Sequence, residues 1–242
     1  MRQLTFLLII ILPFTILAQN TSKNKQQKLK QILMGLNLSP DYSYRTLKSD
    51  GTMFSGSVVS SRNNQEVAKF GYTVGLNIYF NITSRAAFET GIQYSNKGYK
   101  TKLMDLVWLQ PDPSLPTKGK FIYNISYLDI PAKINLTFGE KKLRFCAGAG
   151  LAVNFLIKQT ITSIQNYTNG DTKRKTSSSN NNYKKLNLSP IISAGFDYTF
   201  NNKNSLKVEP TFRYGILKII DAPVSENLWN VGLNIGYYFK LK

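Results

Sequence analysis

The chain has 242 residues, and its 31 Lys and Arg against 13 Asp and Glu give a formal net charge of +18. It contains no histidine and one cysteine, Cys146, which excludes a histidine general base, a histidine metal ligand and an intrachain disulfide. The absence of these groups argues against most classes of enzyme. We therefore expect no catalytic, cofactor-binding or metal-binding residues.

The first residues have the pattern of a secretory signal. A positive start, Met1-Arg2, precedes an apolar run over 4–17 that ends at Ala18. The run is too short for a transmembrane helix and ends on a small residue suited to cleavage. We predict a signal peptide over 1–18 and a periplasmic segment over 19–31; the alternative is an N-terminal membrane anchor.

The rest of the chain alternates between apolar and other residues, which is the pattern of β-strands. Apolar residues take every second position in eight segments: 34–45, 70–80, 86–94, 128–138, 143–155, 186–200, 206–216 and 229–239. Short polar turns join some neighbours, at 81–84, 139–142 and 201–204, whereas 48–67, 100–120, 158–185 and 218–227 are long loops. This alternation of turns and loops predicts an all-β, eight-stranded antiparallel up-and-down barrel over 32–242.

The barrel could hold its apolar face inside, as a soluble carrier does, or outside against lipid. Aromatic residues gather at both ends of the apolar face, as at the two interfaces of a membrane. The other face carries glycines and charges that suit a narrow, paired interior. The sequence therefore favours a transmembrane barrel with turns periplasmic and loops extracellular. Its expected luminal charge network comprises Arg85, Glu89, Asp129, Lys133, Arg144, Asp197, Lys207, Glu209 and Arg213.

The turn at 201–203 fixes a register for the strands beside it. If it has three residues, paired residue numbers sum to 404, so Asp197 faces Lys207 on the luminal side and Phe196 faces Val208 on the lipid side. We expect Asp197 and Lys207 to pair. A filled lumen of this kind would not conduct.

Several segments together resemble the PorT-like family of small outer-membrane β-barrel proteins of Bacteroidetes-type bacteria. They are 35–39 (GLNLS), 88–95 (FETGIQYS), 127–131 (YLDIP), 146–150 (CAGAG) and 231–239 (VGLNIGYYF). The resemblance implies an outer-membrane location and an association with type IX protein secretion. The C-terminus also resembles the signal read by the barrel-assembly machinery, through Asn234, Gly236, Phe239 and Leu241, although the chain continues to Lys242.

Three other segments invite specific interpretations. Leu106, Trp108 and Leu109 either fold over the barrel mouth, which we favour, or contact another protein. Lys173, Arg174 and Lys175 lie in a polar loop and are expected to be solvated and mobile, or else to contact lipopolysaccharide phosphates. The 127–131 segment reads as a strand start with a bulge, because the apolar positions change from odd to even there.

The leading functional hypothesis is a non-enzymatic outer-membrane barrel with a structural or partner-binding role. The setting that the resemblance implies is an accessory of type IX secretion, and another envelope complex is the other setting considered. The alternative is a small channel or hydrophobic-ligand carrier. Expected partners are outer-membrane lipid and lipopolysaccharide, the barrel-assembly machinery and other envelope proteins. Nucleic acid would suit the positive charge, but the sequence contains no nucleic-acid-binding motif and the export signal argues against that partner.

Overall fold

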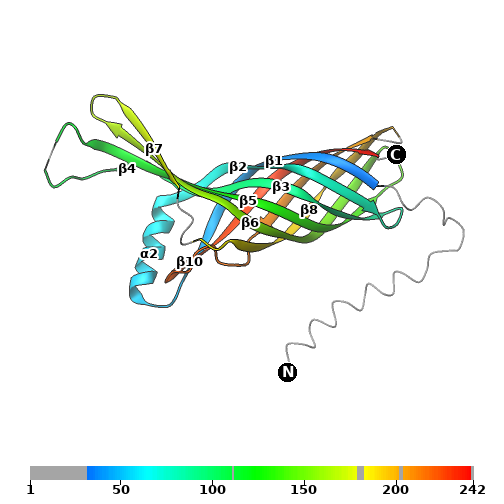
Figure 1. Cartoon of the computed structure of the whole chain (residues 1–242), viewed down its shortest axis with the longest axis horizontal. Helices are drawn as coiled ribbons and strands as arrows, with labels where there is room; N and C mark the ends of the chain where they lie inside the picture. The colour runs from blue at the N-terminus through cyan, green and yellow to red at the C-terminus, as the bar shows by residue number, and fades with distance from the viewer. Residues whose placement is uncertain (1–31, 111, 179–182, 202–203, 241–242) are drawn as a thin grey trace, which may run out of the picture. The chain divides into compact units, whose positions relative to one another are not determined.

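Eight antiparallel strands close into a ring in the computed structural model, which describes residues 32–110, 112–178, 183–201 and 204–240 (Figure 1). The predicted signal peptide and the 19–31 segment lie outside the described residues. The ring strands are β1 (Ile32–Ser49), β2 (Glu66–Asn81), β3 (Ala86–Thr101), β5 (Pro116–Phe138), β6 (Leu143–Tyr167), β8 (Leu186–Asn201), β9 (Asn204–Tyr214) and β10 (Val224–Lys240). Each pairs with its neighbour in the chain, and β10 pairs with β1 to close the barrel. The predicted eight-stranded up-and-down barrel is confirmed.

The two faces of the barrel differ as the alternation predicts. Apolar side chains on the outer wall are exposed, for example Leu36 at 58% and Ile192 at 58%. Polar and charged side chains on the inner face are buried, for example Asp41 at 1% and Glu209 at 0%. This is the inverse of a water-soluble barrel, so the outer wall faces lipid.

Aromatic rings form a belt at each end of the outer wall. At the turn end, Phe138 and Phe145 lie with ring centroids 6.1 Å apart. At the loop end, Tyr42 packs on Phe70 at 5.8 Å. Such belts mark the two membrane–water interfaces.

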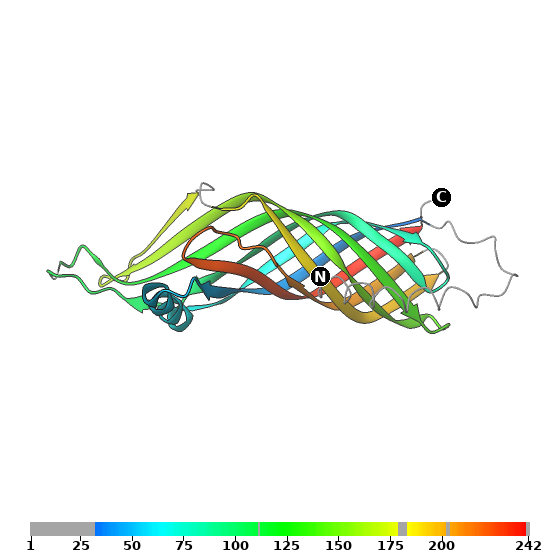
Figure 2. The same ribbon diagram turned by 90° about the horizontal axis from the view of Figure 1, so that it is seen from below.

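Two strands, β5 and β6, continue far beyond the loop-end belt and form an arm (Figures 1 and 2). The arm comprises 116–125 of β5 and 158–167 of β6, flanked by the short strands β4 (Met104–Asp105) and β7 (Thr172–Ser178). The sequence predicted loops here. It missed these strands because the outward positions of the arm are no longer consistently apolar and include Lys120 and Lys158, so the alternation of the barrel wall stops.

A bulge lies where the arm leaves the barrel. Ser126 pairs with Lys158 while Tyr127 pairs with Leu156, so Ile157 is an extra residue in β6. The bulge predicted within 127–131 is wrong, because the extra residue belongs to β6 and β5 keeps one register with β3 through this point. The predicted strand start at Tyr127 is also wrong, since β5 begins at Pro116. The change from odd to even apolar positions has another cause: the inward face becomes apolar above the membrane.

One helix, α2 (Met53–Gln65), occupies the first loop and was not predicted. Thr52 caps its first turn by accepting a hydrogen bond from the Ser55 amide at 3.3 Å. No helix in the described part of the chain is long and apolar enough to span a membrane.

Candidate functional site: the filled lumen and the arm

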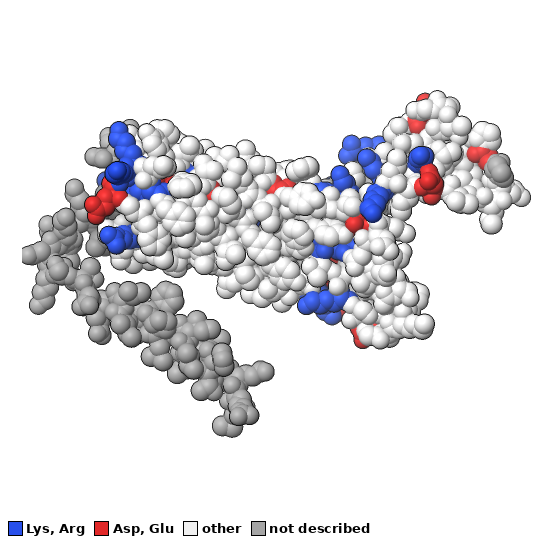
Figure 3. Space-filling view, turned by 180° about the vertical axis from the view of Figure 1, so that it is seen from behind, with Lys and Arg blue, Asp and Glu red and all other residues white. Residues whose placement is uncertain are grey.

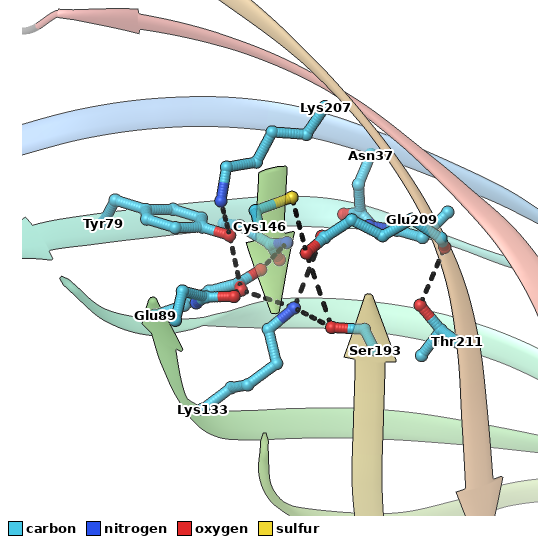
Figure 4. Close-up of polar contacts among 12 residues, drawn as sticks. Asn37, Tyr79, Glu89, Lys133, Cys146, Ser193, Lys207, Glu209 and Thr211 are labelled. Carbon is cyan, nitrogen blue, oxygen red and sulfur yellow. Dashed lines mark hydrogen bonds and ion pairs between the residues drawn. The ribbon is translucent and has the colours of Figure 1, made fainter. Parts of the chain in front are cut away.

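A charged network fills the middle of the lumen (Figure 4). Lys133 from β5 lies between two carboxylates, 2.9 Å from Glu89 of β3 and 3.5 Å from Glu209 of β9. Lys133 is 5% exposed and the two acids 2% and 0%. Three of the predicted luminal charges therefore form one buried cluster, whose burial is tolerable because each charge has an opposite partner.

Glu89 is the best-satisfied member of this cluster. Its carboxylate also accepts hydrogen bonds from Asn77 (2.7 Å), Tyr79 (2.7 Å) and Asn135 (2.8 Å). The Tyr79 hydroxyl in turn accepts a hydrogen bond from the Lys207 ammonium at 3.0 Å, and that ammonium stands 4.3 Å from the centroid of the Tyr79 ring. The Glu89 carboxylate thus links β2, β3 and β5 directly, and β9 joins them through the Tyr79 hydroxyl.

A second pair of contacts lies closer to the loop end. Asp129 is 3.3 Å from Lys97, and Asp41 is 3.6 Å from Arg213. Lys97 and Asp41 were not among the predicted network residues. Both occupy inward positions in the alternation of β3 and β1, so the same pattern could have found them.

At the turn end, Asp197 binds Arg144 with a separation of 2.7 Å. The predicted register is confirmed, because Asp197 faces Lys207 and Phe196 faces Val208. The three-residue turn from which it was derived is wrong: Asn201 pairs with Asn204, and an irregularity between Thr199 and Asn201 restores the register. The ion-pair partner expected for Asp197 is wrong, however. The Asp197 carboxylate pairs with Arg144 of β6, while the Lys207 ammonium donates to the Tyr79 hydroxyl.

Arg85 does not belong to the lumen. It lies in the turn between β2 and β3, where it is exposed. The prediction extended the alternation of β3 one residue too far, since the strand begins at Ala86.

Small cavities remain among the luminal side chains. Two cavities of about 10 Å³ each lie among the inward side chains, one beside Lys97 and Tyr127 and the other beside Lys133 and Arg213. A volume of this size holds about one water molecule. Glycines make room for the charged groups, since a Cβ at Gly232 would clash with the Asp41 carboxylate.

The loop end of the lumen is closed by an apolar cluster, the mouth core. It consists of Tyr99, Ile125, Tyr127, Ile219 and Leu228, all at most 3% exposed. Ile219 comes from the last loop, so this loop folds inward. Tyr183 packs on the cluster and forms a bridge to Ile220.

Charged residues link α2 to this mouth. Arg62 of α2 lies 2.8 Å from Glu66 and 2.7 Å from Glu226, and Arg45 lies 2.7 Å from Glu66. Burial opposes the charge on Arg62, but the hydrogen bond to Glu66 and the charge of Glu226 outweigh it and raise the pKa of Arg62. Because arginine stays charged at ordinary pH, Arg62 holds the helix to the mouth through ion pairs whose cation does not titrate.

The loop over 103–115 lies at the end of the arm and extends away from the barrel (Figures 1 and 2). Val107 and Leu109 are fully exposed, at 94% and 106%, and Trp108 is 45% exposed. Leu106 is partly covered by the arm, close to Gly119. The favoured interpretation that this loop covers the mouth is wrong; the mouth core does so.

The basic triplet Lys173, Arg174 and Lys175 lies in β7, at the edge of the arm, with all three residues exposed. The expectation of solvation is confirmed. A regular hairpin with β6 takes the place of the expected irregular loop. Lysines on an edge strand also discourage unwanted pairing with other strands.

The predicted assembly-signal residues lie on β10. Asn234 and Gly236 face the lumen, and Phe239 lies on the outer side near the turn-end belt. Leu241 lies outside the described residues. Among the described residues, no group of three or more His, Cys, Asp or Glu side chains could hold a metal ion.

A closed antiparallel barrel with an apolar, belted outer wall and a charged, filled interior defines an integral outer-membrane β-barrel protein. Residues 17–221 match the family model described as "Outer membrane protein beta-barrel domain", and the chain belongs to this family. The outer membrane is therefore its location.

Solved structures of outer-membrane barrels resemble the chain at low sequence identity. Neisserial surface protein A is 12% identical, over 87% of this chain and 97% of that one, with a TM-score of 0.46. The N-terminal barrel of Pseudomonas aeruginosa OprF is 18% identical (85% and 97% covered, TM-score 0.32), and the Escherichia coli protease OmpT is 7% identical (91% and 100% covered, TM-score 0.44). A comparison with curated proteins finds none that matches. At these identities and TM-scores, the functions of these proteins are not assigned to this chain.

Proposed function

We propose that the protein is a non-enzymatic, non-conducting barrel that binds a partner protein through its arm. In this proposal its loops are extracellular and its termini periplasmic. The resemblance to PorT-like proteins suggests the setting, as an accessory of type IX secretion or of another envelope complex. The observation that carries the proposal is an arm of paired strands with an exposed apolar tip on a barrel whose lumen is filled.

The lumen supports the first half of this proposal. The Glu89–Lys133–Glu209 cluster crosses the barrel, and the cavities beside it hold about one water each. An ion path would have to break buried ion pairs, and a hydrophobic ligand would find a polar, occupied interior. The channel and carrier alternative is therefore disfavoured.

The arm supports the second half. Exposed apolar residues such as Val107 and Leu109 are typical of protein-contact surfaces when they gather at one place. Their position is held by the Trp108 indole N–H, which donates to the Pro116 carbonyl at 2.7 Å, and by the paired strands beneath. A rigid tip binds at a lower entropic cost than a mobile loop.

Site-specific photo-crosslinking in native membranes tests the proposal. A photoreactive residue at Leu109 should yield an adduct with a defined envelope protein. The matched control is Asn169, in the exposed polar turn between β6 and β7, which should yield none. Equal adducts at both positions, or none at Leu109, would overturn the proposal.

A further inference from the structure

Four cations share one face of the arm. Lys120 of β5 lies opposite Ile164, which lies opposite Arg174 of β7. Lys100 of β3 lies opposite Ile122, two residues along β5 from Lys120, and Lys158 lies opposite Ser126 of the same strand. Because directly paired residues and every second residue of a strand point to the same side, Lys100, Lys120, Lys158 and Arg174 form one surface, the basic face.

The basic face continues the lipid-facing wall. Ser126 precedes Leu128 by two residues, and Leu128 is on the outer wall, 36% exposed, at the loop end. The cations therefore begin directly beyond the point where the apolar wall ends. Lys and Arg gather in a band at the base of the arm in Figure 3, next to a barrel wall with few charges.

These cations also lack acidic neighbours. Elsewhere at the loop end Lys118 lies 3.6 Å from Asp105, and Lys184 lies 3.1 Å from Asp221. Within the described residues, no carboxylate lies within 4.0 Å of a cationic group of the basic face. Its charge is available to an external anion.

We propose that the basic face binds the phosphate groups of lipopolysaccharide in the surrounding outer leaflet. Lys and Arg are the side chains that bind phosphate, and this face begins with Lys158, directly beyond the end of the apolar wall, and extends outward along the arm. The proposal rests on the orientation given above, with the loops extracellular. It names a lipid partner for the base of the arm, separate from the protein partner at its tip.

The register divides the basic triplet of β7. Arg174 belongs to the basic face, whereas Lys173 and Lys175 alternate to the opposite side. The Lys173 ammonium stands 4.7 Å from the centroid of the Tyr167 ring. Two pairs of cations on the same arm thus provide a test with matched changes in net charge.

The experiment measures binding of fluorescent lipopolysaccharide to the full chain in detergent micelles, with dephosphorylated lipopolysaccharide as the second probe. The double variant Lys120→Gln with Arg174→Gln should weaken binding of the phosphorylated probe by roughly 10-fold. Lys173→Gln with Lys175→Gln should change it by less than about twofold, because neither residue faces the lipid. Binding of the dephosphorylated probe should be weak and equal in all three proteins.

Equal losses in both variants would mean that only net charge matters, and equal binding of the two probes would exclude phosphate recognition; either result overturns the proposal. Crosslinking through Leu109, repeated in both double variants, separates the two proposals. If the Leu109 crosslink persists but the two double variants bind lipopolysaccharide equally, only the proposal for the basic face is refuted. If the two double variants differ in lipopolysaccharide binding but Leu109 gives no crosslink, only the proposal for the protein-binding tip is refuted.

Discussion

Asp197 and Lys207 lie directly opposite each other in the β8–β9 ladder, yet they take different partners. Asp197 binds Arg144, whose side chain is 31% exposed, at 2.7 Å. Lys207 lies deeper and donates to the Tyr79 hydroxyl. Adjacent luminal charges therefore belong to separate groups: a partly hydrated pair at the turn end and a buried network around Glu89.

This division predicts unequal costs for removing two luminal carboxylates. Glu89→Ala should lower the free energy of unfolding by about 3–5 kcal/mol, because it removes the closer of the two carboxylates beside the buried Lys133 ammonium and the acceptor of the Asn77 and Tyr79 hydrogen bonds. Asp197→Ala should cost only about 1 kcal/mol, because water reaches the Arg144 side chain. Urea unfolding of the purified protein in lipid bilayers measures both values.

The exposed turn residue Glu140 provides the control for this comparison, and Glu140→Ala should leave the free energy of unfolding nearly unchanged. An equal cost for Glu89→Ala and Asp197→Ala would contradict the division of the lumen into a dry centre and a wetter turn end.

The start of α2 should depend on pH through Asp50. Hydrogen bonds from Ser55 and Thr52 hold the pKa of Asp50 below its ordinary value of 3.8. Since the folded pKa is the lower one, this support is complete above the ordinary value and is lost as the pH falls through the folded pKa. The protection of the first-turn amides of α2 against hydrogen exchange, measured relative to an unstructured peptide at the same pH, should therefore fall in acid.

The variant Asp50→Asn should lower the same protection at neutral pH and make it less dependent on acid. Exchange of β-strand amides in the barrel serves as the internal control. If α2 keeps the same protection in acid and in the variant, Asp50 does not support the helix.

Orientation can be tested with introduced thiols. Cys146 is 0% exposed, so the natural chain should not react with a membrane-impermeant maleimide. Leu109→Cys should be labelled on intact cells, because the arm is proposed to be extracellular. Glu140→Cys, in the turn between β5 and β6, should be labelled only after the outer membrane is broken, and the reverse order would place the arm in the periplasm.

The barrel was predictable because lipid enforces a strict alternation over the membrane-spanning part of each strand. Where that constraint ends, the prediction fails. Tyr123, Ile125 and Tyr127 keep the inward face of β5 but become apolar, because they pack in the mouth core instead of facing charged groups. Helix α2 has no apolar stripe to reveal it.

The luminal site was predictable as a set of residues but not as a set of contacts. Alternation identifies that Asp197 faces inward, and its register with Lys207 was predicted correctly, although the strands reach it through an Asn201–Asn204 pair and an irregularity at Thr199 rather than through a three-residue turn. Asp197 lies directly opposite Arg144 of β6 as well as Lys207 of β9, and which of the two cations reaches its carboxylate depends on the side-chain conformations. For the same reason the part played by Tyr79, between Lys207 and Glu89, was not foreseen.

The most direct test of the central claim is planar-bilayer recording of the purified full-length protein. A barrel closed by the Glu89–Lys133–Glu209 cluster and the mouth core should show no steady conductance, and Ile219→Ser should not open it, because the charged cluster below remains. A stable, reproducible open-channel current from the natural chain would contradict the filled-lumen account and favour the channel alternative.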